Sequence, residues 1–237
     1  QGSRLLSFAL FADDQVIIEL LLAQGVVIPN DPSLVFCAID RNYVGALKFF
    51  LEQKLDTNCR DSRGNTLLHH AIKQSCDEIV ILLINHQVAL RQRNEGKVSP
   101  LISALCEGRP NIAKLLITKH LSEEDINDLN QPDIIGNTPL HYAALYGYTE
   151  IAQMLLAKGV AINQKNDDCY TPLLVALFAG YGAIVKLLLR AGAMLDREYA
   201  EDLTELFMAV LNNEIGTIIR LLNDGAVFFT AGKKLTP

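Results

Sequence analysis

The amino-acid sequence repeats itself at a nearly constant spacing. A hydroxyl residue opens each of six copies, at Ser33, Thr66, Ser99, Thr138, Thr171 and Thr204. Successive positions are 33 residues apart, except that 39 residues separate Ser99 from Thr138. An irregular first copy fits the same register if Arg4 takes the hydroxyl position. A fixed period of this length predicts a solenoid, in which each unit buries its apolar face against its neighbours.

Alanine provides an independent check of this register. The fifth residue after each opening position is an alanine in all seven copies, namely Ala9, Ala38, Ala71, Ala104, Ala143, Ala176 and Ala209. A small side chain at one fixed position allows a neighbouring helix to approach closely. We therefore number the copies one to seven from this register.

Each copy is predicted to form two short helices. The opening hydroxyl can cap the first helix, and Pro100, Pro139 and Pro172 follow it at the first helical position, where a missing N–H costs nothing. The first helix should end nine positions after the hydroxyl, at Ser75, Gly108, Gly147, Gly180 or Asn213. The second helix carries apolar pairs and should end at Gly25, Gly159, Gly192 or Gly225.

These motifs resemble the ankyrin-repeat family, whose T-P-L-H-x-A-A motif lies in a 33-residue unit. The match is close over 65–71, 137–144 and 171–176, and weaker in copies one, two and seven. The resemblance implies an all-α ankyrin-repeat solenoid of stacked helix-turn-helix units with short hairpin loops. His69 and His141 occupy the family's histidine position, which implies a hydrogen bond to the repeat's own backbone and hydroxyl. The other copies carry Ser7, Phe36, Ile102, Leu174 and Phe207 there.

The chain is predicted to be a single domain over 1–237. Its approximate repeats are 1–29, 30–62, 63–95, 96–134, 135–167, 168–200 and 201–237. The fourth contains a six-residue insertion, around Leu121 to Gln131, in which an extra helical turn should begin near Ser122. This insertion either lengthens the outer edge or forms a protrusion for a partner. Apolar residues in both end copies favour a domain that is part of a longer protein.

Composition excludes several classes of function. The formal charge of -6 argues against nucleic-acid binding through phosphate contacts. The sequence has five cysteines, an odd number, with no C-x-x-C pair. This pattern argues against a disulfide framework or a zinc site and favours an intracellular, cytoplasmic location. No apolar run is long enough for membrane insertion.

The sequence contains no recognisable catalytic motif. G-x-x-x-x-G-K-[ST], G-x-G-x-x-G and H-E-x-x-H are absent. His69 and His70 are adjacent, but consecutive residues on a helix point in different directions. We therefore expect no enzyme, cofactor, metal or small-molecule substrate. A metal-dependent or hydrolytic enzyme is the hypothesis that this pattern disfavours.

The resemblance implies that a partner binds to the concave face, formed by hairpin tips and the exposed side of each first helix. In copy three the implied contact positions include the basic residues Arg60, Arg63 and Lys73. Copies five and six instead place apolar or aromatic side chains there and on the same helix face, namely Ile134, Ile135, Tyr142, Leu145, Tyr146, Tyr170 and Phe178. Exposed apolar surface usually marks an interaction site, and tyrosine is favoured at binding hot spots. The competing interpretation is that these side chains pack on one another and extend the core.

The predicted function is a scaffold or adaptor that binds a protein or peptide. The alternative is a targeting domain of a larger multidomain protein, such as a secreted bacterial effector acting in a host cell with its enzymatic activity elsewhere.

Overall fold

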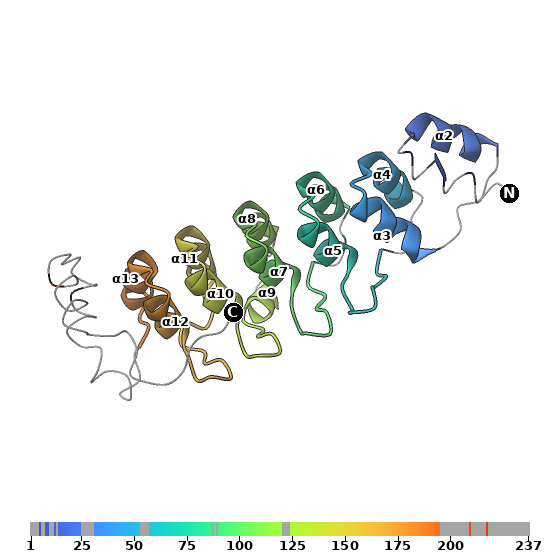
Figure 1. Ribbon diagram of the computed structural model, residues 1–237. Helices are drawn as coiled ribbons and strands as arrows, with labels where there is room; N and C mark the ends of the chain where they lie inside the picture. The colour runs from blue at the N-terminus through green and yellow to red at the C-terminus, as the bar shows by residue number, and fades with distance from the viewer. Residues whose placement is uncertain are drawn as a thin grey trace. The chain divides into compact units, whose positions relative to one another are not determined.

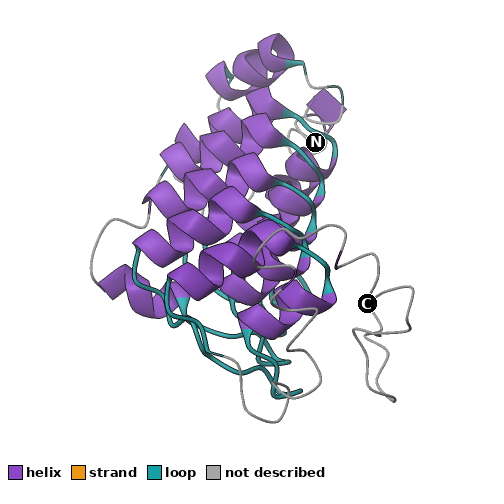
Figure 2. Ribbon diagram, turned by 90° about the vertical axis from the view of Figure 1, so that its left-hand side faces the viewer, coloured by secondary structure: helices purple, strands orange, loops and turns teal. Residues whose placement is uncertain are grey.

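The computed structural model describes residues 5, 8–9, 12, 14, 15–24, 31–52, 57–86, 88, 90–119, 124–194, 209 and 217. The chain divides into two compact units, Gln1–Leu121 and Ser122–Pro237, which are described separately below. The regular elements in the described ranges are helices joined by short loops (Figure 2). The predicted fold class, an all-α solenoid of stacked helix-turn-helix units, is confirmed. The single domain over 1–237 stays a prediction.

The first unit stacks the helix pairs of copies two to four, and the second helix of copy one packs on that of copy two. Its helices are α2 (Gln15–Ala23), α3 (Pro32–Asp40), α4 (Val44–Glu52), α5 (Leu67–Lys73), α6 (Asp77–Asn85), α7 (Pro100–Cys106) and α8 (Pro110–Lys119). First helices pack on first helices, α3 on α5 and α5 on α7, while α4 packs on α6 (Figure 1). The loops between copies project on the side of the first helices. Each copy thus contacts the next through equivalent faces.

The second unit contains copies five and six and the insertion. Its helices are α9 (Glu124–Leu129), α10 (Pro139–Leu145), α11 (Thr149–Ala157), α12 (Pro172–Phe178) and α13 (Gly182–Arg190). Again α10 packs on α12 and α11 on α13. The extra helical turn predicted in the insertion is α9. Leu129 at its end is buried, and the Asn130 side chain accepts a hydrogen bond from the N–H of Ala161 at 2.7 Å.

The helix starts follow the predicted capping with one exception. Thr66, Ser99, Thr138 and Thr171 are the N-caps of α5, α7, α10 and α12. In copy two, however, the N-cap is Asp31 and not Ser33. The Asp31 carboxylate accepts a hydrogen bond from the Ser33 N–H at 2.9 Å, and Pro32 occupies the first helical position. Hydrogen bonds from the Ser33 side chain and backbone lower the pKa of Asp31. Thr204 lies outside the described residues.

The helix ends also match the prediction. Ser75, Gly108, Gly147 and Gly180 have φ values between 62° and 77°, in the left-handed region that ends many helices. Gly147 is also required sterically, because a Cβ there would lie 2.5 Å from the ring of Tyr181. Gly159 and Gly192, which follow the second helices, likewise have positive φ. Asn213, Gly25 and Gly225 lie outside the described residues.

The alanine register coincides with the core. All seven predicted alanines are buried, and those of copies three to six are fully buried at 0% exposure. Close packing leaves little space for extra methylene groups at these positions. The buried alanines therefore agree with the repeat register derived from the sequence.

Candidate functional site

The hairpin tips are shaped by a short acidic or amide side chain. In the first unit the Asp61 carboxylate accepts hydrogen bonds from the N–H groups of Arg63 and Asn65, both at 2.8 Å. Burial alone would raise the pKa of Asp61, but hydrogen bonds from the Asn65 side chain and these N–H groups lower it. In the second unit Asp133 accepts equivalent bonds from Ile135 and Asn137. Each turn therefore presents its two middle side chains outward.

Two buried histidines, one on α5 and one on α10, each link a first helix to the hairpin of the following copy. His69 Nδ1 lies 2.8 Å from the Thr66 hydroxyl, and its Nε2 lies 2.9 Å from the carbonyl oxygen of Val98. His141 repeats this arrangement with Thr138 and the carbonyl of Tyr170. The bond to the repeat's own hydroxyl was predicted, whereas the bond to the following copy was not. Burial is the main cause that lowers the pKa of both imidazoles.

Asparagine side chains add a second link between neighbouring hairpins. The Asn94 amide donates to the Asn65 side chain at 2.8 Å, and Asn166 donates to Asn137 at the same distance. These bonds hold consecutive hairpin tips at a fixed spacing within each unit. The tips are therefore a rigid platform for exposed side chains.

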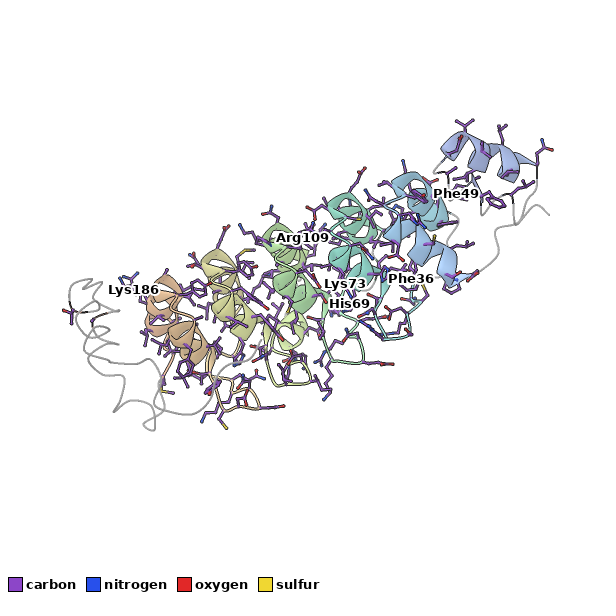
Figure 3. The ribbon with its side chains drawn as sticks, in the orientation of Figure 1. Phe36, Phe49, His69, Lys73, Arg109 and Lys186 are labelled. Carbon is purple, nitrogen blue, oxygen red and sulfur yellow. The ribbon has the colours of Figure 1, made fainter. Side chains whose placement is uncertain are left out.

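A polar cavity lies between the hairpins and first helices of copies three and four. Its volume is about 620 Å³, and charged side chains of both signs line it, including Arg63, Lys73, Glu95 and Glu107. Figure 3 shows His69 and Lys73 together on α5. Two of the three predicted basic residues, Arg63 and Lys73, thus face one cavity.

Arg60 is exposed but does not line this cavity, and its guanidinium has hydrogen-bond partners within the chain. Its guanidinium donates to the carbonyl oxygens of Gly64 and Arg93, each at 2.7 Å, and to the Gln92 side chain at 3.1 Å. Arg60 therefore joins the hairpins of copies three and four. The cause is the length of the arginine side chain, which reaches the backbone of the following copy.

His70, next to His69, has separate partners. Its Nε2 lies 2.5 Å from Asp40 Oδ1, and its ring packs edge-on against Phe36 at a centroid distance of 5.2 Å. Asp40 also accepts from the Gln74 side chain at 2.7 Å. The two histidines therefore serve different contacts, as their directions on the helix predicted. In the described part of the chain, no three His, Cys, Asp or Glu side chains converge as a metal site requires.

The hairpin tip of copy five is apolar and exposed. Ile134 is 63% exposed and Ile135 is 53% exposed. The same two positions hold Ser62 and Arg63 in copy three. Among the described hairpins, copy five is distinguished by two adjacent isoleucines that face solvent.

The exposed tip continues onto helix α10 through a tyrosine. The hydroxyl of Tyr142 donates a hydrogen bond to Oδ2 of Asp133 at 2.5 Å. Asp133 directly precedes Ile134 in the chain. The Tyr142 ring stacks on Tyr146 with centroids 6.2 Å apart, and Tyr146 is 39% exposed. Leu145 on the same helix is half-buried. We define Ile134, Ile135, Tyr142, Leu145 and Tyr146 as the copy-five surface.

Copy six departs from the prediction that its aromatic residues face solvent. Tyr170 is only 9% exposed, and its ring packs edge-on against Phe178 at 5.3 Å. Its N–H donates to Asn166 Oδ1 at 2.9 Å and its carbonyl accepts from His141. The hairpin bonds hold Tyr170 against the helix, so this pair extends the core. Phe178 is half-buried.

Asp133, which accepts the hydrogen bond from the Tyr142 hydroxyl, was not predicted as a site residue. The available signal was an aspartate three positions before a glycine, as in Asp61 to Gly64 and Asp133 to Gly136. This spacing defines the tight turn and would have identified the carboxylate that faces the first helix.

Comparison with known proteins agrees with the repeat geometry. A family model described as ankyrin repeats in three copies matches four overlapping stretches, residues 34–130, 91–166, 118–199 and 140–231. In the described part of the chain, no helix has both the length and the apolar character needed to span a membrane.

Individual relatives share the repeats but differ in length. The human transient receptor potential cation channel subfamily A member 1 is 37% identical over 102 residues, which cover 42% of this chain and 9% of the channel. A Rickettsia bellii protein named as an ankyrin repeat protein is 32% identical over 113 residues, 47% of this chain and 33% of its own length. The Escherichia coli ankyrin repeat protein YahD is 28% identical over 166 residues, 67% of this chain and 81% of its own length. The chain thus spans a third or less of the first two relatives. On the family match and the stacked geometry together, the chain belongs to the ankyrin-repeat family.

Proposed function

We propose that this chain is a scaffold or adaptor that binds a protein partner on its concave face, with the copy-five surface as the main contact. Ankyrin repeats generally mediate interactions between proteins. The observation that carries this proposal is the adjacent pair Ile134 and Ile135, more than half exposed on a hairpin held by hydrogen bonds.

Burial of apolar surface can supply the binding free energy. Fully burying an isoleucine side chain is worth about 1.5–3 kcal/mol, so two half-exposed isoleucines leave a comparable gain available to a partner. Tyr146 adds an aromatic ring whose orientation is already restricted by stacking on Tyr142. A preformed surface loses little conformational entropy on binding.

The charged side chains of the polar cavity in the first unit suit a role in the rate and specificity of binding. Arg63 and Lys73 are exposed there beside Glu95 and Glu107. Charges in such a setting steer association and favour one orientation of the partner more than they raise affinity. We propose that the cavity contributes to association rate and specificity.

The cysteines support an intracellular setting for this binding. All five, Cys37, Cys59, Cys76, Cys106 and Cys169, carry free thiols. Free thiols persist in reducing compartments. We therefore propose a cytoplasmic partner.

Site-specific photo-crosslinking tests the proposed function. A photoreactive phenylalanine analogue replaces Ile134 in one variant and Ile81 in a matched control, because Ile81 is 44% exposed on α6. After irradiation in lysate, a defined protein adduct is expected from position 134 and not from position 81. The same adducts from both positions, or none from position 134, would contradict the proposal.

A further inference from the structure

Two carboxylates stand beside the exposed isoleucines in the second unit. Asp167 and Asp168 occupy the same repeat positions in copy six as Ile134 and Ile135 in copy five, and both are exposed. The Asp167 N–H donates to the Ile135 carbonyl oxygen at 3.2 Å. A Cβ placed on Gly136 would lie 2.7 Å from Asp167 Oδ1, so this carboxylate lies against the tip of the copy-five hairpin.

Neither carboxylate is paired with a cation in the described part of the chain. The ion pairs found there involve Asp40, Asp61 and Asp77. The Asp168 N–H donates to Asn166 Oδ1 at 3.2 Å, which fixes the backbone of the turn beneath both side chains. Two adjacent acidic residues thus lie on a hydrogen-bonded turn at the edge of an apolar surface.

The corresponding tips in the first unit lack this combination. Copy three carries Ser62 and Arg63, and copy four carries Glu95 and Gly96. An apolar tip beside an acidic tip therefore occurs, among the described hairpins, only in copies five and six. A partner that has an apolar group beside a positive charge would match this pairing of tips, since apolar contact provides affinity and charge complementarity provides selection.

We propose that the partner segment bound at the copy-five surface carries an apolar anchor next to a lysine or arginine. This inference rests on the proposed function. The anchor covers Ile134 and Ile135, and the cationic group lies between the carboxylates of Asp167 and Asp168. Arginine suits this arrangement because its planar guanidinium can donate to two carboxylate oxygens at once.

Selection from a displayed library of random 12-residue peptides tests this inference on the full chain. Selected peptides are titrated against the wild type, Ile134→Ser, and the double variant Asp167→Asn, Asp168→Asn. The control is Glu52→Gln, Glu78→Gln, which makes the same change in net charge at exposed positions of α4 and α6. Each selected peptide is titrated against each variant at low and at high salt concentration.

The expected result is enrichment of an apolar residue next to Lys or Arg. Binding should weaken at least tenfold in Ile134→Ser and about three- to tenfold in the double Asp variant, with no change in the control. The salt dependence of affinity should diminish only in the double Asp variant.

The outcomes separate the inference from the proposed function. Peptides that depend on Ile134 but lack basic residues and bind the double Asp variant normally would overturn the inference alone. Peptides that bind Ile134→Ser normally would overturn both, and so would a library that yields no binder.

Discussion

The Tyr142 hydroxyl donates a hydrogen bond to Asp133, which joins helix α10 to the hairpin that carries the exposed isoleucines. Asp133 is 6% exposed, so its Oδ2 depends on this donor. Tyr142→Phe should destabilise the second unit by about 1–3 kcal/mol, because a buried acceptor loses its partner. Tyr181→Phe is the matched control, since Tyr181 is 40% exposed and its hydroxyl can bond to water. Urea unfolding measures both variants, and equal stability would contradict the structural role of this bond.

The buried histidines make stability depend on pH. His69 and His141 have pKa values below the ordinary value of 6.5, so the folded state binds fewer protons than the unfolded state at mildly acidic pH. Their contribution is fully present above about pH 6.5 and is lost as the pH falls through the lowered folded-state pKa. Denaturant titrations at about pH 8, pH 6 and pH 5 should show this loss.

A double variant isolates the two histidines. His69→Gln, His141→Gln should be less stable at about pH 8, by roughly 1–3 kcal/mol per site, because each removes a buried bridge to the next copy. Between about pH 7 and pH 5 it should lose less stability than the wild type, because the two imidazoles with lowered pKa values are gone. An unchanged pH dependence would assign the effect to other groups.

The alanine positions should tolerate no larger side chain. Ala143→Leu and Ala176→Leu should each destabilise the second unit by about 1–3 kcal/mol, because both alanines are fully buried in helix contacts. Gln153→Leu, on the exposed side of α11, should have little effect. Thermal melts compare the three variants, and similar shifts in all of them would refute the repeat register.

The fourth position of the hairpin turn provides a paired test of backbone strain. Gly136 has φ of 80°, and a Cβ there would lie 2.6 Å from the Asp167 nitrogen, so Gly136→Ala should cost at least about 1–2 kcal/mol. Cys169 occupies the equivalent position with φ of 64°. Cys169→Gly should therefore stabilise the chain by about 0.5–1 kcal/mol net of glycine's entropy cost. Changes of the same sign in both variants would contradict this assignment.

The helices were predictable because their signals are local. Thr66 and Ser99 cap helices, and Gly108 and Gly147 end them, through backbone preferences that the residue type alone determines. The N-cap of copy two was predicted wrongly, because Asp31 before Pro32 provides a stronger cap than Ser33. The alanines were predictable for a different reason, since one spacing recurs throughout the chain.

The site was less predictable, because a repeat position does not determine where a side chain points. Ile134 and Ile135 are exposed as expected, since tight-turn residues project outward. Tyr170 occupies an implied contact position but packs on Phe178, and Arg60 bonds to the next hairpin. These outcomes depend on neighbours 8 to 33 residues away, which local patterns do not specify.

Two measurements on the variants Tyr146→Ala and Phe178→Ala together test the central claim most directly. Titration calorimetry gives their affinity for the partner that photo-crosslinking identifies, and thermal melts give their stability. Tyr146→Ala should weaken binding by about 1–3 kcal/mol with little change in melting temperature, because its ring lies on the exposed surface. Phe178→Ala should show the opposite order, an early melt with near-normal affinity in the folded fraction, because its ring packs on Tyr170. Normal affinity in Tyr146→Ala together with weakened binding in a stably folded Phe178→Ala would contradict the assignment of the copy-five surface as the main contact.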